Sequence, residues 1–396
     1  MSSSGGGGNS PFAWLGLLKW SLAHQDGTRP SSDVAPMSEE DRKFLESVMK
    51  DGIVDEGERM KTILTELTES LETIRDSVPG ETESNGGERK RKELSEDEIS
   101  DLLLELRDIV EQIDYARAFT AMGGLPFLIG CASENKAVPR TIRSECLGVL
   151  ATLCQNNPPV QQALIEMGHI RALSNIYFGE YPKEDDAGGD ADESDGMVRT
   201  RVIQALSCSV RGHAAAEELL SNDDDGRRSI ESGLGMHTDA ETLPKPPLKL
   251  RKRCMFLLRA LVTSDTATEE RVELFAPSIR YAAAAFLDIA LEPDAELREM
   301  SLELLAEVLR RKKGVNVVVD LKGPLGVLGV QRVLAIKALE GEEREYASVE
   351  LEGWEGLLVE LAKIRVTDTN KDSSAEPQNP PDSSSSDKPM LLLGGP

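Results

Sequence analysis

The residues of this chain that could carry chemistry are few, and they lie far apart in the sequence. No histidine has a cysteine or a second histidine at metal-site spacing: His24, His169, His213 and His237. The five cysteines include no Cys-x-x-Cys pair, which indicates reduced thiols rather than zinc ligands or redox pairs. The P-loop, nucleophile-elbow and zinc-protease motifs are missing. We therefore predict a protein that is not an enzyme, with no catalytic residue, no metal and no cofactor.

One acidic run has a composition similar to that of a calcium-binding loop. Residues 190–196 read Asp-Ala-Asp-Glu-Ser-Asp-Gly. In an EF-hand register, however, Asp195 occupies the glycine position and the closing glutamate is absent. We interpret the run as a solvated acidic loop.

The formal net charge of the chain is −25, from 45 basic and 70 acidic residues. This charge argues against nucleic acid, whose binders carry a basic footprint, and against an anionic membrane surface. No apolar stretch is long enough to span a bilayer, and the first residues lack the basic region of a signal peptide. We expect a cytoplasmic protein, with the nucleus as an additional location.

A chain without reactive side chains is expected to act by binding a partner on the surface of its fold. The sequence predicts that this fold is helical. Aromatic residues make up only 4% of the chain, which argues against a β-sandwich or barrel. Apolar residues recur at helical spacing from 96 to 366, and a separate amphipathic helix is predicted over 56–76. We interpret 315–319, which has Gly314 and Gly323 around it, as a loop between helices.

Composition divides the chain into three parts. Residues 1–95 are predicted to form a flexible N-terminal region with amphipathic helices, in which 77–92 is a linker. Residues 96–366 form the helical domain. Residues 367–396 are dominated by Ser, Asp and Pro, cannot bury a core and are expected to be disordered. We interpret Met-Leu-Leu-Leu at 390–393 as a frayed end, with a short docking segment as the alternative.

The helical domain contains an internal repeat. Four segments share an apolar stripe and a basic second residue: 142–155, 198–212, 248–265 and 297–311, with a looser match at 101–113. Those basic residues are Arg143, Arg199, Lys249 and Arg298. Each segment has one leucine at a matching position, and we call these the anchor leucines: Leu106, Leu150, Leu206, Leu258 and Leu305. Successive anchor leucines are 44, 56, 52 and 47 residues apart. We attribute the two long intervals to insertions at 184–195 and 221–247.

A period of about 40–47 residues with two or three helices is that of armadillo and HEAT repeats. The predicted fold class is therefore all-α, an armadillo/HEAT-like superhelix of helical repeats with a flexible N-terminal arm and a disordered C-terminal tail. Gly123 and Gly168 lie 45 residues apart, at matching helix ends that need a left-handed residue. Stacked repeats bury one continuous core and present a concave surface suited to binding a partner.

Armadillo proteins that carry extended peptides use an asparagine at one fixed position of each third helix. In this chain other residues occupy that position: Asp108, Thr152, Cys208, Ala260 and Glu307. Binding of an extended nuclear-localisation peptide is therefore not expected.

Several groups of residues match one family in order and spacing. They are Leu-Leu-Lys-Trp-Ser at 17–21, the stretch 37–45, Ile-Asp-Tyr-Ala at 113–116 before 123–125, Gln-Asn-Asn-Pro at 155–158 before Val160 and Gln161, and Arg201 with 205–208 and Arg211. Through these residues the chain resembles, over 12–310, the cytosolic armadillo-type nucleotide-exchange factors of the 70-kDa heat-shock chaperone. The insertion at 184–195 is longer than the family pattern, and the match weakens beyond 310.

The resemblance implies a co-chaperone that needs no catalytic residue. Members of this family grip the second lobe of the chaperone's ATPase domain in their concave face, so that ADP leaves and the client is released. An N-terminal segment is implied to help free clients, and its apolar residues here are Trp14, Leu15, Leu17, Leu18 and Trp20. The alternative for that segment is a helix docked on the first repeat. We expect a monomer when free; the alternative function is a general armadillo scaffold or adaptor.

Candidate contacts on the concave face come from the last helix of each repeat: Glu145, Asn156, Asn157, Arg201, Gln204, Arg211, Arg253, Glu303 and Arg310. Asn156 and Asn157 alternatively cap the helix that begins at Pro158. Arg211 and Arg253 are alternatively solvated or paired with acids inside the array. The basic stretch 249–253 could serve as a nuclear signal, but its interleaved apolar residues favour a helix start. Arginine in a strongly acidic chain is worth testing because it is enriched in interface hot spots.

Overall fold

The helix predicted over 56–76 is α3 (Glu56–Asp76), and it shows how the chain forms its elements. Met60, Ile63 and Leu67 recur on one side of α3 and are almost fully buried. At its start, the Asp55 carboxylate accepts hydrogen bonds from the backbone N–H groups of Gly57 and Glu58, which satisfies two otherwise unpaired donors. Two contributions thus stabilise α3: burial of its apolar side against the rest of the fold, and the polar cap at its start.

The computed structural model describes residues 39, 43, 55–76, 94–180, 196–236 and 245–364. Within these ranges the regular structure is entirely helical and contains no strand, which confirms the all-α prediction. The linker 77–92, the insertion 184–195, the tail 367–396 and the apolar cluster from Trp14 to Trp20 lie outside the described residues. None of the described helices has the length and apolarity that a bilayer crossing requires.

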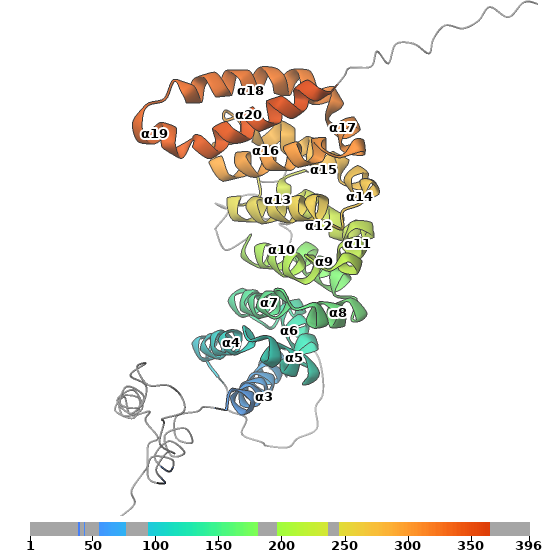
Figure 1. Ribbon diagram of the computed structural model, residues 1–396. Helices are drawn as coiled ribbons and strands as arrows, with labels where there is room; N and C mark the ends of the chain where they lie inside the picture. The colour runs from blue at the N-terminus through green and yellow to red at the C-terminus, as the bar shows by residue number, and fades with distance from the viewer. Residues whose placement is uncertain are drawn as a thin grey trace, which may run out of the picture.

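One helix from each repeat stacks on its counterparts in a single column (Figure 1). We call these the third helices: α4 (Glu96–Val110), α7 (Arg140–Cys154), α10 (Met197–Val210), α13 (Leu248–Thr263), α16 (Ala295–Leu309) and α20 (Ser348–Lys363). The predicted anchor leucines lie on the first five of them, and each is 0% exposed. Leu357 is the matching buried leucine of α20, which sequence reasoning did not assign to the repeat.

Pairs of helices precede α7, α10, α13 and α16. They are α5 (Ile113–Ala121) and α6 (Gly124–Ser133), α8 (Pro158–Glu166) and α9 (His169–Gly179), α11 (Ala214–Asn222) and α12 (Asp224–Leu234), and α14 (Glu269–Leu274) and α15 (Ala276–Phe286). The last repeat has α17 (Lys312–Val318), the 3-10 turn η4 (Val319–Leu321), α18 (Lys322–Lys337) and α19 (Gly341–Tyr346) before α20. The chain is therefore a superhelical stack of armadillo-like three-helix repeats.

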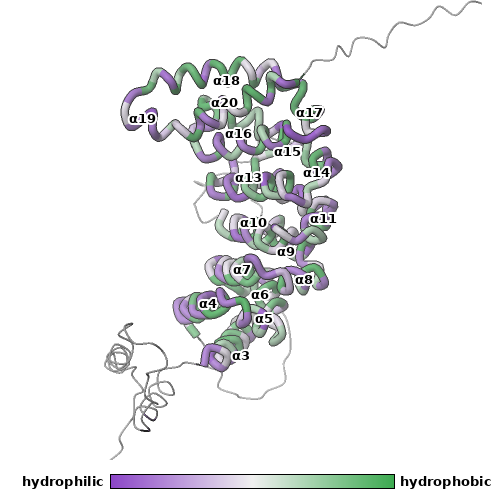
Figure 2. Tube along the Cα trace, viewed as in Figure 1, coloured by the Kyte–Doolittle hydropathy of each residue, from purple (hydrophilic) through white to green (hydrophobic). Residues whose placement is uncertain are grey.

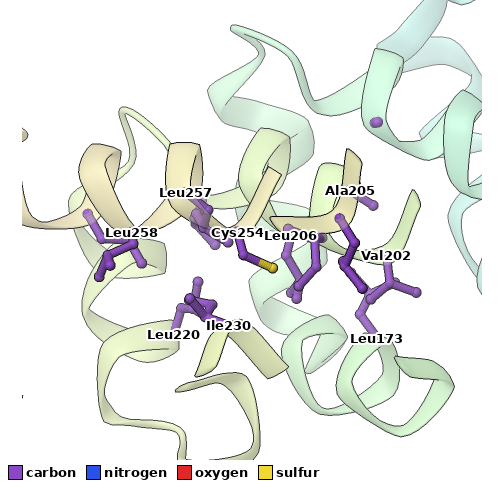
Figure 3. Packing of buried hydrophobic residues seen from close by; sticks show 14 of the residues in the cluster. Leu173, Val202, Ala205, Leu206, Leu220, Ile230, Cys254, Leu257 and Leu258 are labelled. Carbon is purple, nitrogen blue, oxygen red and sulfur yellow. The ribbon is translucent and has the colours of Figure 1, made fainter. Parts of the chain in front are cut away.

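The core runs through the stack without interruption. Figure 3 shows Leu173 of α9, Val202 and Leu206 of α10, Ile230 of α12 and Cys254 of α13 in one packed cluster. These side chains come from successive repeats, so no repeat buries its apolar side alone. The array is held by contacts between neighbours rather than by separate globular cores.

Left-handed residues occupy the turns between helices where the register predicted them. Gly123 after α5 has φ 85° and Gly168 after α8 has φ 67°, which confirms the predicted pair. A second matching pair lies in the turns that follow α7 and α10, where Asn156 has φ 54° and Gly212 has φ 75°. Asn tolerates this conformation better than other non-glycine residues.

The predicted loop at 315–319 is wrong. Residues 312–318 form α17, and Val317 and Val318 are buried in the core. Gly314 suggests a loop in the sequence, but a Cβ there would lie 1.9 Å from the carbonyl oxygen of Val308. The glycine therefore permits close packing of α17 against the end of α16 instead of ending a helix.

The predicted insertion at 221–247 is also partly wrong, because it contains the repeat helix α12. The acidic residues at its start are a helix N-terminus: the Asp223 carboxylate accepts a hydrogen bond of 2.7 Å from the N–H of Gly226. Asp224 and Asp225 follow in the first turn, where negative charge is favourable. Composition alone made a capped helix of the repeat look like part of an insertion.

The repeated basic residue needs one correction as well. Arg143, Arg199 and Arg298 each lie seven residues before the anchor leucine, and at that place α13 has Arg251, not Lys249. All four arginines are buried, between 2% and 7% exposed, whereas Lys249 is exposed. They are therefore core residues of the repeat.

Three of these arginines pair with a buried carboxylate of the following repeat. Arg143 donates to Glu180 over 2.7 Å, Arg251 pairs with Glu292, and Arg298 donates to Glu350 over 3.0 Å. A buried guanidinium needs such a partner, because an uncompensated buried charge is costly. The pairs therefore link α7, α13 and α16 to the repeats that follow them.

Candidate partner-binding face

Seven of the nine predicted contact residues occupy equivalent places on the third helices. They lie five residues before, two before or five after the anchor leucine: Glu145, Arg201, Arg253, Gln204, Glu303, Arg211 and Arg310. None of them is fully buried, so together they mark one outer side of the column. We call this side the third-helix face.

Arginines from three repeats gather on the N-terminal half of this face. Burial lowers the pKa of Arg201, and the positive charges of Arg107 and Arg253 lower it further, while Glu145 opposes them. Arg107 of α4 and Arg253 of α13 therefore each lie close enough to Arg201 of α10 to repel it. Arg201 crosses the intervening helix at Gly148, whose Cβ would lie 4.0 Å from the guanidinium carbon.

An aromatic ring adjoins these arginines. The guanidinium carbon of Arg211 lies 4.7 Å from the ring centroid of Phe256, and that of Arg259 lies 5.9 Å from it. Burial raises the pKa of the neighbouring Cys208 thiol, against the influence of Arg211 and Arg253. Cation–π geometry of this kind holds an arginine in place without neutralising its charge.

We call Arg107, Arg201, Arg211, Arg253 and Phe256 the arginine cluster. Arg201 donates a 2.8 Å hydrogen bond to neutral Gln204, and the Nε atoms of Arg107 and Arg211 are buried without a partner. Among the described residues none of the four arginines forms a salt bridge. The cluster can therefore accept carboxylates from outside the chain.

The C-terminal half of the face is acidic, and its arginines are already paired. Glu303 forms a salt bridge with Arg259, while Arg310 pairs with Glu307 at 2.6 Å and with Glu360 at 3.8 Å. An open groove of about 680 Å³ lies here between α13, α16 and α20, and Gly353 and Gly356 are among its lining residues. The predicted contacts Glu303 and Arg310 thus each have an ion-pair partner within the chain, unlike the arginines of the N-terminal half.

The two predicted asparagines lie at the end of this face, in the turn between α7 and α8. Asn156 is exposed, whereas Asn157 is only 2% exposed and so does not offer its side chain to a partner. Asn157 is the N-cap of α8 and Pro158 follows at the first helical position, but the asparagine side chain makes no capping hydrogen bond. The capping interpretation is therefore correct in position and wrong in mechanism.

Sequence reasoning missed two members of the arginine cluster. Arg107 directly follows an anchor leucine, a position that the helical projection did not include, and it comes from the segment that matched the repeat most loosely. Phe256 lies two residues before its anchor leucine, the same position as Gln204 and Glu303. Extending the projection to every residue of that position would have found Phe256.

In the part of the chain that the structure describes, the residues with metal or catalytic potential lie apart from one another. His169 is buried, and one of its ring nitrogens lies 3.0 Å from the hydroxyl of Ser209. Four of the five cysteines are buried and all are free thiols. No group of three or more His, Cys, Asp or Glu residues in the described ranges is arranged to hold a metal ion.

Comparison with protein-family models finds no match, and comparison with curated proteins finds none. Among solved structures the chain is similar to a designed armadillo repeat protein, with 13% identity and a TM-score of 0.46, over 74% of this chain and 99% of that chain. It is also similar to an engineered protein, with 13% identity and a TM-score of 0.45, over 74% and 96%. Likenesses this weak carry no inference about function, and the repeat architecture rests on the helices of the chain itself.

Proposed function

We propose that this chain is a non-enzymatic co-chaperone that binds the ATPase domain of the 70-kDa heat-shock chaperone and promotes release of ADP. The proposal starts from a repeat stack, whose extended surface suits protein interaction. The family resemblance of the sequence then supplies the specific partner. The observation that carries it is the arginine cluster, an unpaired cationic and aromatic surface on a chain of net charge −25.

The proposed contact puts acidic side chains of the ATPase domain against the arginine cluster. Arginine and aromatic residues are enriched in interface hot spots, and guanidinium groups bind carboxylates in two-point geometry. The acidic half of the face would then meet a less acidic part of the same partner. Opposite charges at the two ends of one face fix the direction in which a partner lies along the stack.

The proposed activity requires only a difference in affinity between two states of the chaperone. A factor that binds the open, nucleotide-poor conformer more tightly shifts the population towards it, and the shift equals the difference in affinity. Moving an equilibrium from 1:99 to 99:1 takes about 5.5 kcal/mol of such preference. No proton transfer, nucleophile or metal is needed for that step.

Stopped-flow release of fluorescent ADP from a purified heat-shock ATPase tests the proposal. We expect saturating amounts of this chain to accelerate release at least tenfold. Unchanged release with retained binding would support the general scaffold function instead. Absence of binding at micromolar concentrations would reject both the partner and the activity.

A further inference from the structure

Helix α18 carries apolar residues on two opposite sides. On its inner side Leu325, Gly329 and Ile336 are buried, and a Cβ on Gly329 would lie 2.9 Å from the Trp354 ring of α20. On its outer side Val327, Val330 and Leu334 are 61%, 51% and 64% exposed. A helix that is apolar all round is normally covered on all sides.

The outer side forms a continuous stripe without a charged residue. Its members recur at the spacing of one helix side, and all are exposed: Gly323, Val327, Val330, Leu334 and Ala338. We call these residues the α18 stripe. Figure 2 shows hydrophobic residues along much of α18, which forms the end of the stack. Terminal repeats normally present a polar outer side, so an apolar one indicates a contact.

The chain itself passes close to one end of the stripe. The ammonium group of Lys322, the first residue of α18, donates a 2.6 Å hydrogen bond to the carbonyl oxygen of Ile364, just after α20. The apolar segment Met-Leu-Leu-Leu at 390–393 begins 26 residues further along the sequence. Any connector from Ile364 to that segment therefore starts beside α18.

The length of this connector fits the stripe. Twelve residues separate Lys322 from Leu334, which corresponds to about 18 Å along the helix axis. The connector 365–389 has 25 residues, and a random-coil chain of that length has a root-mean-square span of about 28 Å. A tethered segment is then present at an effective concentration in the millimolar range. Even a contact with a Kd of about 1 mM would therefore be substantially occupied.

We propose that residues 390–393 of this chain dock on the α18 stripe and cover the apolar end of the repeat stack. Leucine and methionine side chains match the charge-free valine and leucine surface, and burial of each contributes about 25 cal/mol per Å². A second copy of the chain fits less well. Stable dimers bury at least about 1,000 Å² in total, more than one row of three large side chains per copy supplies. The proposal does not depend on the chaperone partner.

Photo-crosslinking in the full-length chain tests the docking. With p-benzoylphenylalanine in place of Leu392, we expect an intrachain crosslink into 322–338 whose yield is independent of protein concentration. The double substitution Val330→Gln and Leu334→Gln should lower that yield at least threefold. Leu219→Gln on α11 is the matched control, because Leu219 is also exposed, at 47%, but belongs to another helix.

Two outcomes would overturn the proposal. One is the absence of any crosslink into α18, and the other is an interchain crosslink that increases with concentration. Hydrogen exchange provides a second measurement without the crosslinker. Replacing Leu391, Leu392 and Leu393 by serine should speed amide exchange at 327–334 several-fold and leave α11 unchanged. Equal exchange in α18 of the two proteins would count against docking.

Discussion

Arg298 of α16 donates to Glu350 of α20 over 3.0 Å, although the side chains are only 4% and 2% exposed. Arg332 of α18 donates to the same carboxylate at 2.7 and 3.0 Å. Burial alone would raise the pKa of Glu350, but the hydrogen bonds from Arg332 and Arg298 outweigh it and hold the pKa at about 2. Glu350 is therefore ionised at neutral pH and joins three helices at the end of the stack.

Replacing this carboxylate should destabilise the protein. Glu350→Gln keeps the shape but leaves two arginines without their counter-charge, and we expect a loss of about 3 kcal/mol in the free energy of unfolding. Urea denaturation at pH 7 measures it. Glu342→Gln on α19, at an exposed position, should change stability by less than about 0.5 kcal/mol. Equal stability of the two variants would contradict a structural role for the buried pair.

Charge reversal in the arginine cluster should weaken partner binding. The double variant Arg211→Glu and Arg253→Glu places repulsive charges opposite an acidic partner, and we expect at least a tenfold rise in Kd for the ATPase domain. Calorimetry gives the Kd, and circular dichroism should show unchanged helicity. Arg117→Glu on α5 is the control, since Arg117 is a largely exposed arginine outside the cluster. Unaltered affinity of the double variant would remove the cluster from the interface.

Stability should fall in mild acid because of one buried histidine. Burial lowers the pKa of His169 to about 4, from an ordinary value of 6.5. Between pH 6.5 and pH 4 the unfolded chain binds a proton that the folded chain does not. The free energy of unfolding therefore decreases as pH falls through this window, by at most about 1.4 kcal/mol per pH unit.

His169→Leu is the variant that isolates this effect. Its unfolding free energy, measured by urea denaturation at pH 7 and pH 4.5, should change less than that of the natural sequence. Ser209 keeps a partner in this variant, because its hydroxyl also donates to the carbonyl of Leu206. Identical pH dependence of the two proteins would show that His169 does not titrate as proposed.

Two glycine substitutions should act in opposite directions. Gly168→Ala forces a side chain onto a residue with φ 67°, which costs about 1–2 kcal/mol. Gly130→Ala lies within α6, where alanine is favoured by about 0.5–1 kcal/mol. An added Cβ meets no atom within 4 Å at either place, so the comparison isolates backbone conformation. Thermal denaturation should lower the Tm of the first variant and raise that of the second.

Removal of residues 1–35 should separate two parts of the proposed function. If the apolar segment around Trp14 only frees clients, the shortened chain should release ADP at the full rate and release a bound client several-fold more slowly. A fluorescent client peptide and fluorescent ADP provide the two measurements. Loss of ADP release would instead place this segment in the exchange machinery itself.

The sequence alone predicts those helices whose pattern is local. The apolar stripes of α7, α10, α13 and α16 repeat strongly enough to give the fold class and the position of the anchor leucines. Helix α20 escaped the repeat because Glu350 stands where α7, α10, α13 and α16 have an arginine. The structural role of Glu350 follows only from its contact with Arg298, which the sequence pattern does not predict.

The arginine cluster was predictable only in part, for a similar reason. Arg201, Arg211 and Arg253 follow from the register of the helices. Arg107 and Arg201 interact although α4 and α10 are two repeats apart, and the Arg201 side chain lies beside Gly148 of the intervening α7. Such a relation involves three residues distant in sequence, and no periodic pattern encodes it.

The ion pairs between neighbouring repeats determine where the chain can be shortened. A fragment that stops after α13 keeps Arg251 but loses Glu292, and one that stops after α16 keeps Arg298 but loses Glu350. Each would lose the ion pair that joins its last helix to the following repeat, and we expect it to be less stable than a fragment that keeps the pair. A fragment that folds well should therefore keep each of these arginines together with its glutamate. Its boundaries would then not coincide with the ends of the three-helix repeats, because each arginine and its glutamate belong to successive repeats.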